Sequence, residues 1–288
     1  MTWFTLTIFS VFALAVAELT QQHLLNLKNA FNERTSAILT FLIQVFLVVP
    51  FIFALGLSGQ LFSVFSLNVF PKMLAVTFIA SIAMIFYFKS FRVKNISIST
   101  IFNSFSAIVS TSLGIIFFSE SSSHLKFLGI LLILLAIIVM NYKNAILEKN
   151  HLYGLFAGSI YGISYTLDKS IVQSVHPLIY IFWICLMIAV WAFIIDNKSV
   201  RNSLKGKALI SYKPIAISGA SYFLFNVFTF SAYRLGGEVG RIDAINNSEI
   251  FLIILFEFFI LRHTQGTVRK LFSAGLAILG VFILGLVK

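Results

Sequence analysis

The sequence predicts an all-α, polytopic membrane protein of about ten transmembrane helices in two inverted five-helix repeats. Of its 288 residues, 59% are hydrophobic and only 11% are charged, whereas soluble domains have about 45–50% apolar and about 25% charged residues. The mean hydropathy is +0.97, and apolar runs such as 127–140 and 250–261 are long and unbroken. A transmembrane barrel would instead show stretches of about ten residues with alternating polarity, so we expect helices.

Ten apolar segments are separated by polar breaks, and each is long enough to span a bilayer, which takes about 20 residues. The breaks contain turn-forming residues, as in Gly56 to Gly59 and at Gly236-Gly237. The predicted spans are 3–22, 36–56, 70–90, 97–118, 125–143, 152–173, 177–195, 212–234, 239–261 and 269–287.

The chain divides into two similar halves, which we expect to be a first repeat over 1–145 and a second over 146–288. In each half a helix with a polar end comes first and a glycine-containing apolar helix comes last. The glycines of the two closing helices, Gly129 and Gly275, are 146 residues apart. Five spans per half is an odd number, so the second half must enter the membrane from the opposite side. Inverted repeats of this kind are typical of alternating access to a site near the bilayer midplane.

Several residues make the chain resemble the EamA-type drug/metabolite transporters. Gly154, Gly162 and the pair Asp168-Lys169 open the second half, and Glu120 stands at the end of span four, shortly before Gly129. The resemblance covers essentially the whole chain, although its motifs are loose. It implies a ten-helix bundle with a central cavity that moves small metabolites, often outward. Where the second half would repeat Glu120, this chain has Arg262 and His263.

The basic residues are unevenly divided between the two sides of the membrane. On the side of the termini we count six Lys and Arg, and 15 of the 21 fall on the other side, many of them in the loop 196–212. The positive-inside rule therefore predicts that this loop is cytoplasmic and that both termini are outside. The family resemblance implies the reverse. The six residues are Lys72, Lys126, Lys169, Arg234, Arg241 and Lys288.

The formal net charge of +11 does not indicate a nucleic-acid partner, because no basic stripe with interleaved aromatic residues is present. Contact with anionic membrane lipid explains this charge better. The one cysteine, Cys185, lies in an apolar run. It excludes an internal disulfide or a cysteine metal site, and we expect it to pack in the core.

Polar residues at the end of span one are candidates for substrate binding: Glu18, Gln21 and Gln22. A carboxylate in the hydrocarbon costs about 2.5–3.5 kcal/mol on insertion scales, so Glu18 needs a wet cavity, a cation or a proton. Alternatively, it reaches the interface from the end of the span. If transport is coupled to protons, Glu18 is the best candidate for the coupling acid.

The matching part of span six contributes the candidates Tyr165, Asp168 and Lys169. Asp168 and Lys169 are sequence neighbours, so on a helix they diverge by about 100° and cannot face the same way. We expect one of them to face the cavity while the other contacts lipid headgroups. The alternative is that both cap the helix.

Span nine contains the densest polar set of any span, and span four has a milder counterpart in Asn103, Ser104 and Ser106. At about 100° per residue, three binding candidates and Glu257 lie on one face of the helix. Glu249, a fourth candidate, lies at the edge of this arc, and Arg241 points away from it. Such an arc faces the bundle interior, for ligand contact or for interhelical hydrogen bonds. The three candidates are Asp243, Asn246 and Asn247.

Tyr87 and Tyr233 stand beside basic residues at the ends of spans three and eight. Aromatic residues in this position usually anchor a helix at the interface, and the alternative is that both line the mouth of a cavity.

No enzymatic motif is present, and no Walker loop, so we expect neither a cofactor nor a resident metal. The sequence favours a secondary transporter in the cell membrane (plasma or inner membrane), an exporter of a small polar metabolite such as an amino acid, with protons as a candidate coupling ion. The alternatives are a flippase for a lipid-linked substrate and a membrane assembly factor. The sequence leaves substrate identity, orientation and oligomeric state open.

Overall fold

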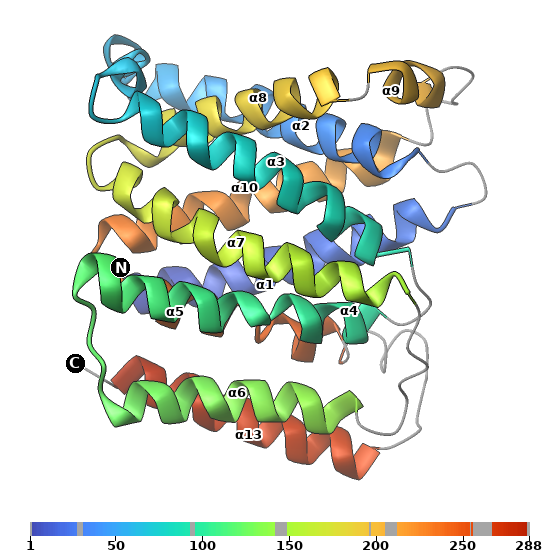
Figure 1. The fold of residues 1–288 in the computed structure, drawn as a ribbon, viewed down its shortest axis with the longest axis vertical. Helices are drawn as coiled ribbons and strands as arrows, with labels where there is room; N and C mark the ends of the chain where they lie inside the picture. Colours follow the sequence, from blue (N-terminus) through green and yellow to red (C-terminus); the bar gives the residue numbers. More distant parts are fainter. Residues whose placement is uncertain are drawn as a thin grey trace.

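The computed structural model describes residues 2–27, 31–92, 96–141, 149–195, 197–204, 212–253, 255 and 267–286. Throughout these ranges the regular secondary structure is helical, and they contain no strand. The prediction of an all-α polytopic protein is confirmed. The helices run roughly parallel or antiparallel to one another, and both termini lie at the same end of the bundle (Figure 1).

The elements follow the predicted spans closely, with two short 3-10 turns between the second and third. The first half comprises α1 (Trp3–Leu25), α2 (Glu33–Ala54), η1 (Ser58–Gln60), η2 (Ser63–Phe65), α3 (Phe70–Ser90), α4 (Ile96–Asn103), α5 (Phe105–Phe118) and α6 (His124–Asn141). The second comprises α7 (His151–Val172), α8 (Pro177–Ile195), α9 (Asn197–Leu204), α10 (Tyr212–Arg234), α11 (Val239–Asn246) and α13 (Thr267–Leu286), with a further helical stretch at 249–253.

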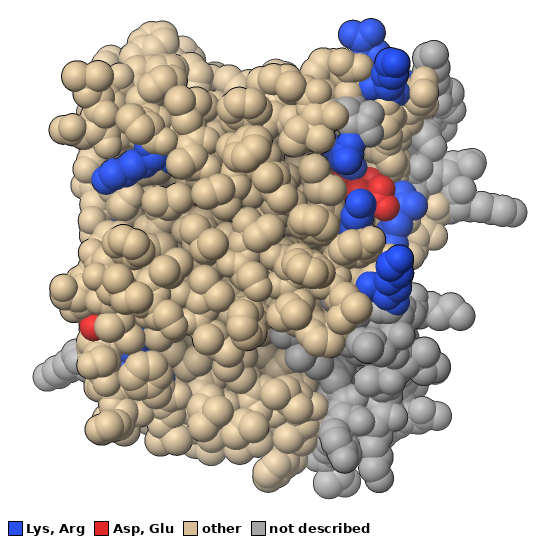
Figure 2. All heavy atoms as spheres, viewed as in Figure 1, with Lys and Arg blue, Asp and Glu red and all other residues tan. Residues whose placement is uncertain are grey.

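The surface and interior are distributed as a bilayer requires. Large apolar side chains point outward, such as Phe46 at 74% exposure and Ile116 at 70%, whereas Glu18 is 1% exposed. On the face shown in Figure 2, the described charged side chains lie toward the two ends and leave a broad band between them. Within the described residues, five helices are long and apolar enough to cross a membrane: α1, α2, α3, α8 and the part of α10 from Lys213.

Spans four and nine differ from the prediction, because each is interrupted where a continuous helix was expected. Ser104 separates α4 from α5, and its hydroxyl donates to the Thr100 carbonyl at 2.8 Å. At the end of α11 the Asn247 side chain donates to the Asp243 carbonyl at 3.0 Å, and a turn follows before the chain resumes as a helix. Each of these two carbonyls also accepts the backbone N–H four residues later, and a side chain that bonds the same carbonyl tends to bend a helix.

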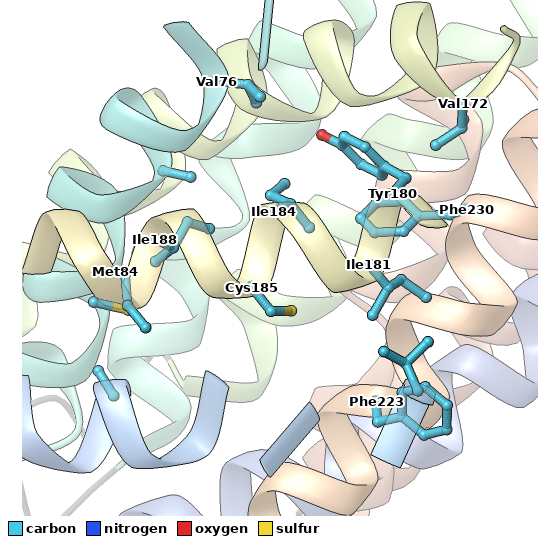
Figure 3. Close-up of a cluster of buried hydrophobic side chains, with 14 of the residues drawn as sticks. Val76, Met84, Val172, Tyr180, Ile181, Ile184, Cys185, Ile188, Phe223 and Phe230 are labelled. Atoms are coloured by element: carbon cyan, nitrogen blue, oxygen red, sulfur yellow. The ribbon is translucent and has the colours of Figure 1, made fainter. Parts of the chain in front are cut away.

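The helices pack mainly between the two halves of the sequence. α1 lies along α10, α3 along α7, α2 along α8, and α6 pairs with α13 at one edge of the bundle (Figure 1). The largest apolar core involves α2, α3, α8 and α10. Figure 3 shows part of it, with Cys185 and Ile188 of α8 among Met84 of α3 and Phe223 of α10. The predicted packing role of Cys185 is confirmed, since its side chain is fully buried.

A stripe of glycines lets α7 approach α4 and α5 closely. A Cβ atom built on Gly158 would lie 2.3 Å from the carbonyl oxygen of Asn103, and one on Gly154 would lie 2.6 Å from that of Ser99. Small residues four apart allow such backbone contact between membrane helices. This contact fixes the position of the Asn103 backbone along the bundle axis.

We predict that Gly158→Ala lowers the melting temperature of the detergent-purified protein by several degrees. The added methyl group has no room against backbone, and overpacking of this kind costs about 1–3 kcal/mol. Gly275→Ala is the matched control, because Gly275 is also helical and has nothing within 4 Å of its Cβ position. Equal melting temperatures for the two variants would contradict the close contact.

Candidate functional site

A cavity of about 860 Å³, including the part open to solvent, lies inside the bundle. Helices of both halves line it, and the sequence-predicted candidates that do so are Glu18, Tyr87, Asn103, Tyr165, Asp168, Asp243, Asn246, Asn247 and Glu249.

Four predicted candidates do not line the cavity. Gln21 is buried, and its Oε1 accepts from Ser218 at 3.1 Å, so it links α1 to α10. Gln22 is only partly buried. Tyr233 is 1% exposed and packs on Phe230, which makes it a core residue. Lys169 joins an ionic cluster described below.

Two of the cavity carboxylates are bound by tyrosine hydroxyls from neighbouring helices. Tyr87 of α3 donates to Oε1 of Glu18 on α1, and Tyr180 of α8 donates to Oδ1 of Asp168 on α7. Neither Glu18 nor Tyr87 therefore acts as an interface anchor, since both are buried. Asp168 and Lys169 diverge as expected, with Asp168 facing the cavity.

Asp243 is the most thoroughly hydrogen-bonded carboxylate of the site. It accepts from Ser106 at 3.0 Å and from Ser110 at 2.8 Å, both on α5, and from the Asn247 amide at 3.3 Å. On the same helix, Asn246 accepts from Ser10 of α1. The polar arc of span nine thus joins three helices, and the turn after α11 brings Glu249 into the cavity as well.

The sequence analysis missed several polar lining residues, among them Tyr161, Tyr222, Gln44 and Asn226. Tyr161 stacks on Tyr165, with ring centroids 5.6 Å apart and planes 10° apart. Asn226 donates to Gln44 at 2.7 Å. An amide in the middle of an apolar span was the available signal for Gln44 and Asn226, whereas nothing local distinguishes Tyr161 from an interfacial tyrosine.

Beside the cavity lies a buried ionic cluster of five charged residues: Glu120, Lys126, Lys169, Glu238 and Arg241. Lys169 Nζ is 2.8 Å from Glu120 Oε1, and Lys126 Nζ lies 3.2 Å from Glu120 Oε2 and 3.0 Å from Glu238 Oε2. The Lys126 side chain has no exposed surface. Such pairing is what allows charges to be buried.

This cluster ties the two halves of the chain together. Glu120 also accepts from the backbone N–H of Val239 at 2.7 Å, and Glu238 accepts from that of Ser121 at 3.1 Å. The segments after α5 and after α10 are thereby joined at the end of the bundle where the termini lie (Figure 1).

The cluster corrects two expectations from the sequence. Lys169 does not contact lipid headgroups, because it pairs with Glu120 inside the bundle. Lys126 and Arg241 are likewise buried, so half of the six basic residues counted on the terminal side are not surface charges there. Lys72 and Arg234 are exposed.

Some sequence-predicted features lie outside the described residues: Glu257, Arg262 and His263. Within the described part of the chain, no group of three or more His, Cys, Asp or Glu side chains is arranged to hold a metal ion.

The described residues form a multi-span helical bundle around a buried polar cavity, the architecture of a membrane-embedded protein with an internal binding site. A solved crystal structure is similar to this chain, with a TM-score of 0.75 and 12% sequence identity; the match covers 98% of this chain and 95% of the other chain. The similarity establishes that the two proteins share a fold. No curated protein sequence matches significantly.

The EamA-like transporter family model matches residues 149–286, which is nearly the whole second half of the chain. The family consists of transporters of small molecules and not of enzymes. The expected resemblance to this family is therefore confirmed over residues 149–286, and the all-α polytopic fold is confirmed as well.

We predict that Glu120→Gln lowers the melting temperature strongly in detergent. The substitution removes the charge that Lys126 and Lys169 share, and loss of one partner of a buried ion pair costs about 3–5 kcal/mol. Glu33→Gln is the control, because Glu33 forms a partly exposed pair with Arg92 of the kind worth about 0–1 kcal/mol. Equal effects of the two substitutions would show that the cluster contributes little.

Proposed function

We propose that the protein is a secondary transporter that exports a small polar metabolite across the cell membrane by alternating access around the central cavity. The observation that carries this proposal is a polar cavity, lined by residues of both halves of the sequence, inside a bundle with an apolar exterior. Polar and ionisable residues within membrane spans commonly mark substrate or ion pathways.

The packing of the helices supports an arrangement in two inverted repeats, 1–145 and 146–288. If the halves are exchanged, the pair α1–α10 becomes α7–α3, while α2–α8 and α6–α13 become themselves; all of these pairs are in contact. The fourth span of each half is also interrupted, after Asn103 and after Asn246. A twofold axis in the membrane plane would produce this pattern.

The ionic cluster supports the proposal that the cavity is closed, in this structure, at the end of the bundle where the termini lie. Glu120 and Lys126 belong to the first half, and Lys169, Glu238 and Arg241 to the second. Relative movement of the halves at this end has to separate these charges. We propose that the cluster is the gate on this side, closed here, and that it opens when the other side closes.

Glu18 is the proposed coupling acid for proton exchange. It is buried, lines the cavity, and has one oxygen, Oε2, without a hydrogen-bond partner, while Oε1 accepts from Tyr87. Lys169 does not neutralise it, because that ammonium pairs with Glu120. A carboxyl group exposed alternately to each side can carry one proton per cycle.

Transport by purified protein in proteoliposomes tests the proposed function. A panel of amino acids and small amines is offered with and without an imposed pH gradient. Uptake above that of protein-free liposomes is expected for at least one compound, increased by the gradient. Absence of uptake together with scrambling of a fluorescent lipid would support the flippase instead.

Glu18→Gln keeps the shape and one hydrogen bond of the side chain but cannot titrate. We expect this variant to retain downhill exchange of the transported compound while losing accumulation driven by the pH gradient. Combining Glu18→Gln with Gln44→Glu places a carboxyl group at another position of the cavity lining. The double variant tests whether a carboxyl group at that position restores coupling. If Glu18→Gln accumulates the compound as the parent protein does, Glu18 is not the coupling acid.

We further propose that the loop 196–212 is cytoplasmic, because it contains the largest cluster of basic residues and half of the cations on the opposite side are buried. Asn202→Cys places a thiol on exposed α9, and the native Cys185 is buried. A membrane-impermeant maleimide should label Asn202→Cys only after permeabilisation of the cells. Labelling in intact cells would show that the loop 196–212 lies outside and would contradict the proposed orientation.

A further inference from the structure

The cavity has an unbalanced charge. Four carboxyl groups line it, those of Glu18, Asp168, Asp243 and Glu249, and no Lys, Arg or His occurs among the described lining residues. The nearby ammonium groups of the ionic cluster are engaged with Glu120 and Glu238. A buried carboxyl group is stabilised by a cation, by water or by a proton, and the described lining supplies no cation for this set.

The unsatisfied atoms of the site are hydrogen-bond acceptors. Oε2 of Glu18, Oε2 of Glu249 and Oδ1 of Asn103 are buried and have no hydrogen-bond partner. Glu249 is 1% exposed and Asn103 is 9% exposed, and all three residues line the cavity. By contrast, Asp243 accepts from three side chains and Asp168 from Tyr180.

The rest of the wall combines uncharged polar side chains, such as Gln44 and Asn226, with aromatic and apolar ones. Tyr161 and Tyr165 form a stack, with Tyr87 edge-on to Tyr161 at 5.5 Å between centroids. Phe225 and Ile184 also line the cavity. This wall is suited to a flat or apolar group, and tyrosine rings attract cations over their faces.

We propose that the cavity binds an organic amine in its protonated form, with the ammonium group donating to Glu249, Glu18 and Asn103 and the apolar part lying against the tyrosines. This inference rests on the proposed function, since it names the class of compound transported. A zwitterionic amino acid fits less well, because its carboxylate would face four acidic side chains without a described cation to receive it.

A matched series of three probes separates these requirements. Tyramine has an ammonium group and an aromatic ring, tyrosine adds a carboxylate, and 4-ethylphenol lacks the amine. Isothermal titration of the detergent-purified full chain at neutral pH should give a dissociation constant for tyramine at least about tenfold lower than for either of the others. Equal or tighter binding of tyrosine, or of 4-ethylphenol, or no binding of tyramine, would overturn the proposal.

Glu249→Gln should weaken tyramine binding by about tenfold or more, because it removes the charge of a buried hydrogen-bonded pair. Glu33→Gln is the control, since it removes a carboxylate outside the cavity. Asn103→Ala provides a second, uncharged test if Glu249→Gln does not fold, and should also weaken binding. Unchanged affinity in the cavity variants would place tyramine elsewhere and contradict the proposal.

The titration needs neither a membrane nor a gradient, so its outcome is independent of transport. Tyramine binding without transport in proteoliposomes would leave the amine site standing and contradict the proposed function. Transport of a different compound without tyramine binding would support the proposed function and contradict the amine site.

Discussion

The structure depends on the requirement that charges inside a membrane protein find partners, since hydrocarbon offers no hydration. Glu120 meets this requirement for two lysines at once and for a backbone N–H of the segment after α10. That arrangement determines which parts of the two halves touch at one end of the bundle. It also withdraws Lys169 from the cavity, which leaves the acidic groups there without a fixed cation. The excess of acidic over basic residues in the cavity lining is therefore a consequence of how the neighbouring charges are paired.

Much of the fold could be predicted from the sequence because hydrophobic segments of about 20 residues have few alternatives to membrane-spanning helices. The ends of α1, α3 and α8 agree with prediction within a few residues. The interruptions at Ser104 and after Asn246 were not predicted, because a hydropathy pattern does not distinguish a straight helix from one bent by side chains that bond its own carbonyls. The carbonyls of Thr100 and Asp243 each accept both a backbone N–H and a side chain.

The candidate site was only partly accessible from the sequence. Nine of the thirteen candidate residues line the cavity, most of them polar groups within apolar spans, because a polar group in such a span turns inward. The exact partners were not predictable, since Glu120 and Lys169 are 49 residues apart and their pairing requires the fold. Tyr233 and Tyr87 occupy similar positions at span ends, yet one is packed in the core and the other borders the cavity, a difference that only the surrounding helices create.

The two interrupted spans have a mechanical consequence. A continuous helix behaves as a stiff rod, so a tilt imposed at one membrane surface reaches the other. At Ser104 and after Asn246 the rod is divided beside the cavity, but both α4 and α5 pack along the uninterrupted α7, and α5 also contacts α11. A displacement of α7 would therefore reach both segments of span four, whereas a bend at Ser104 would change only the angle between them.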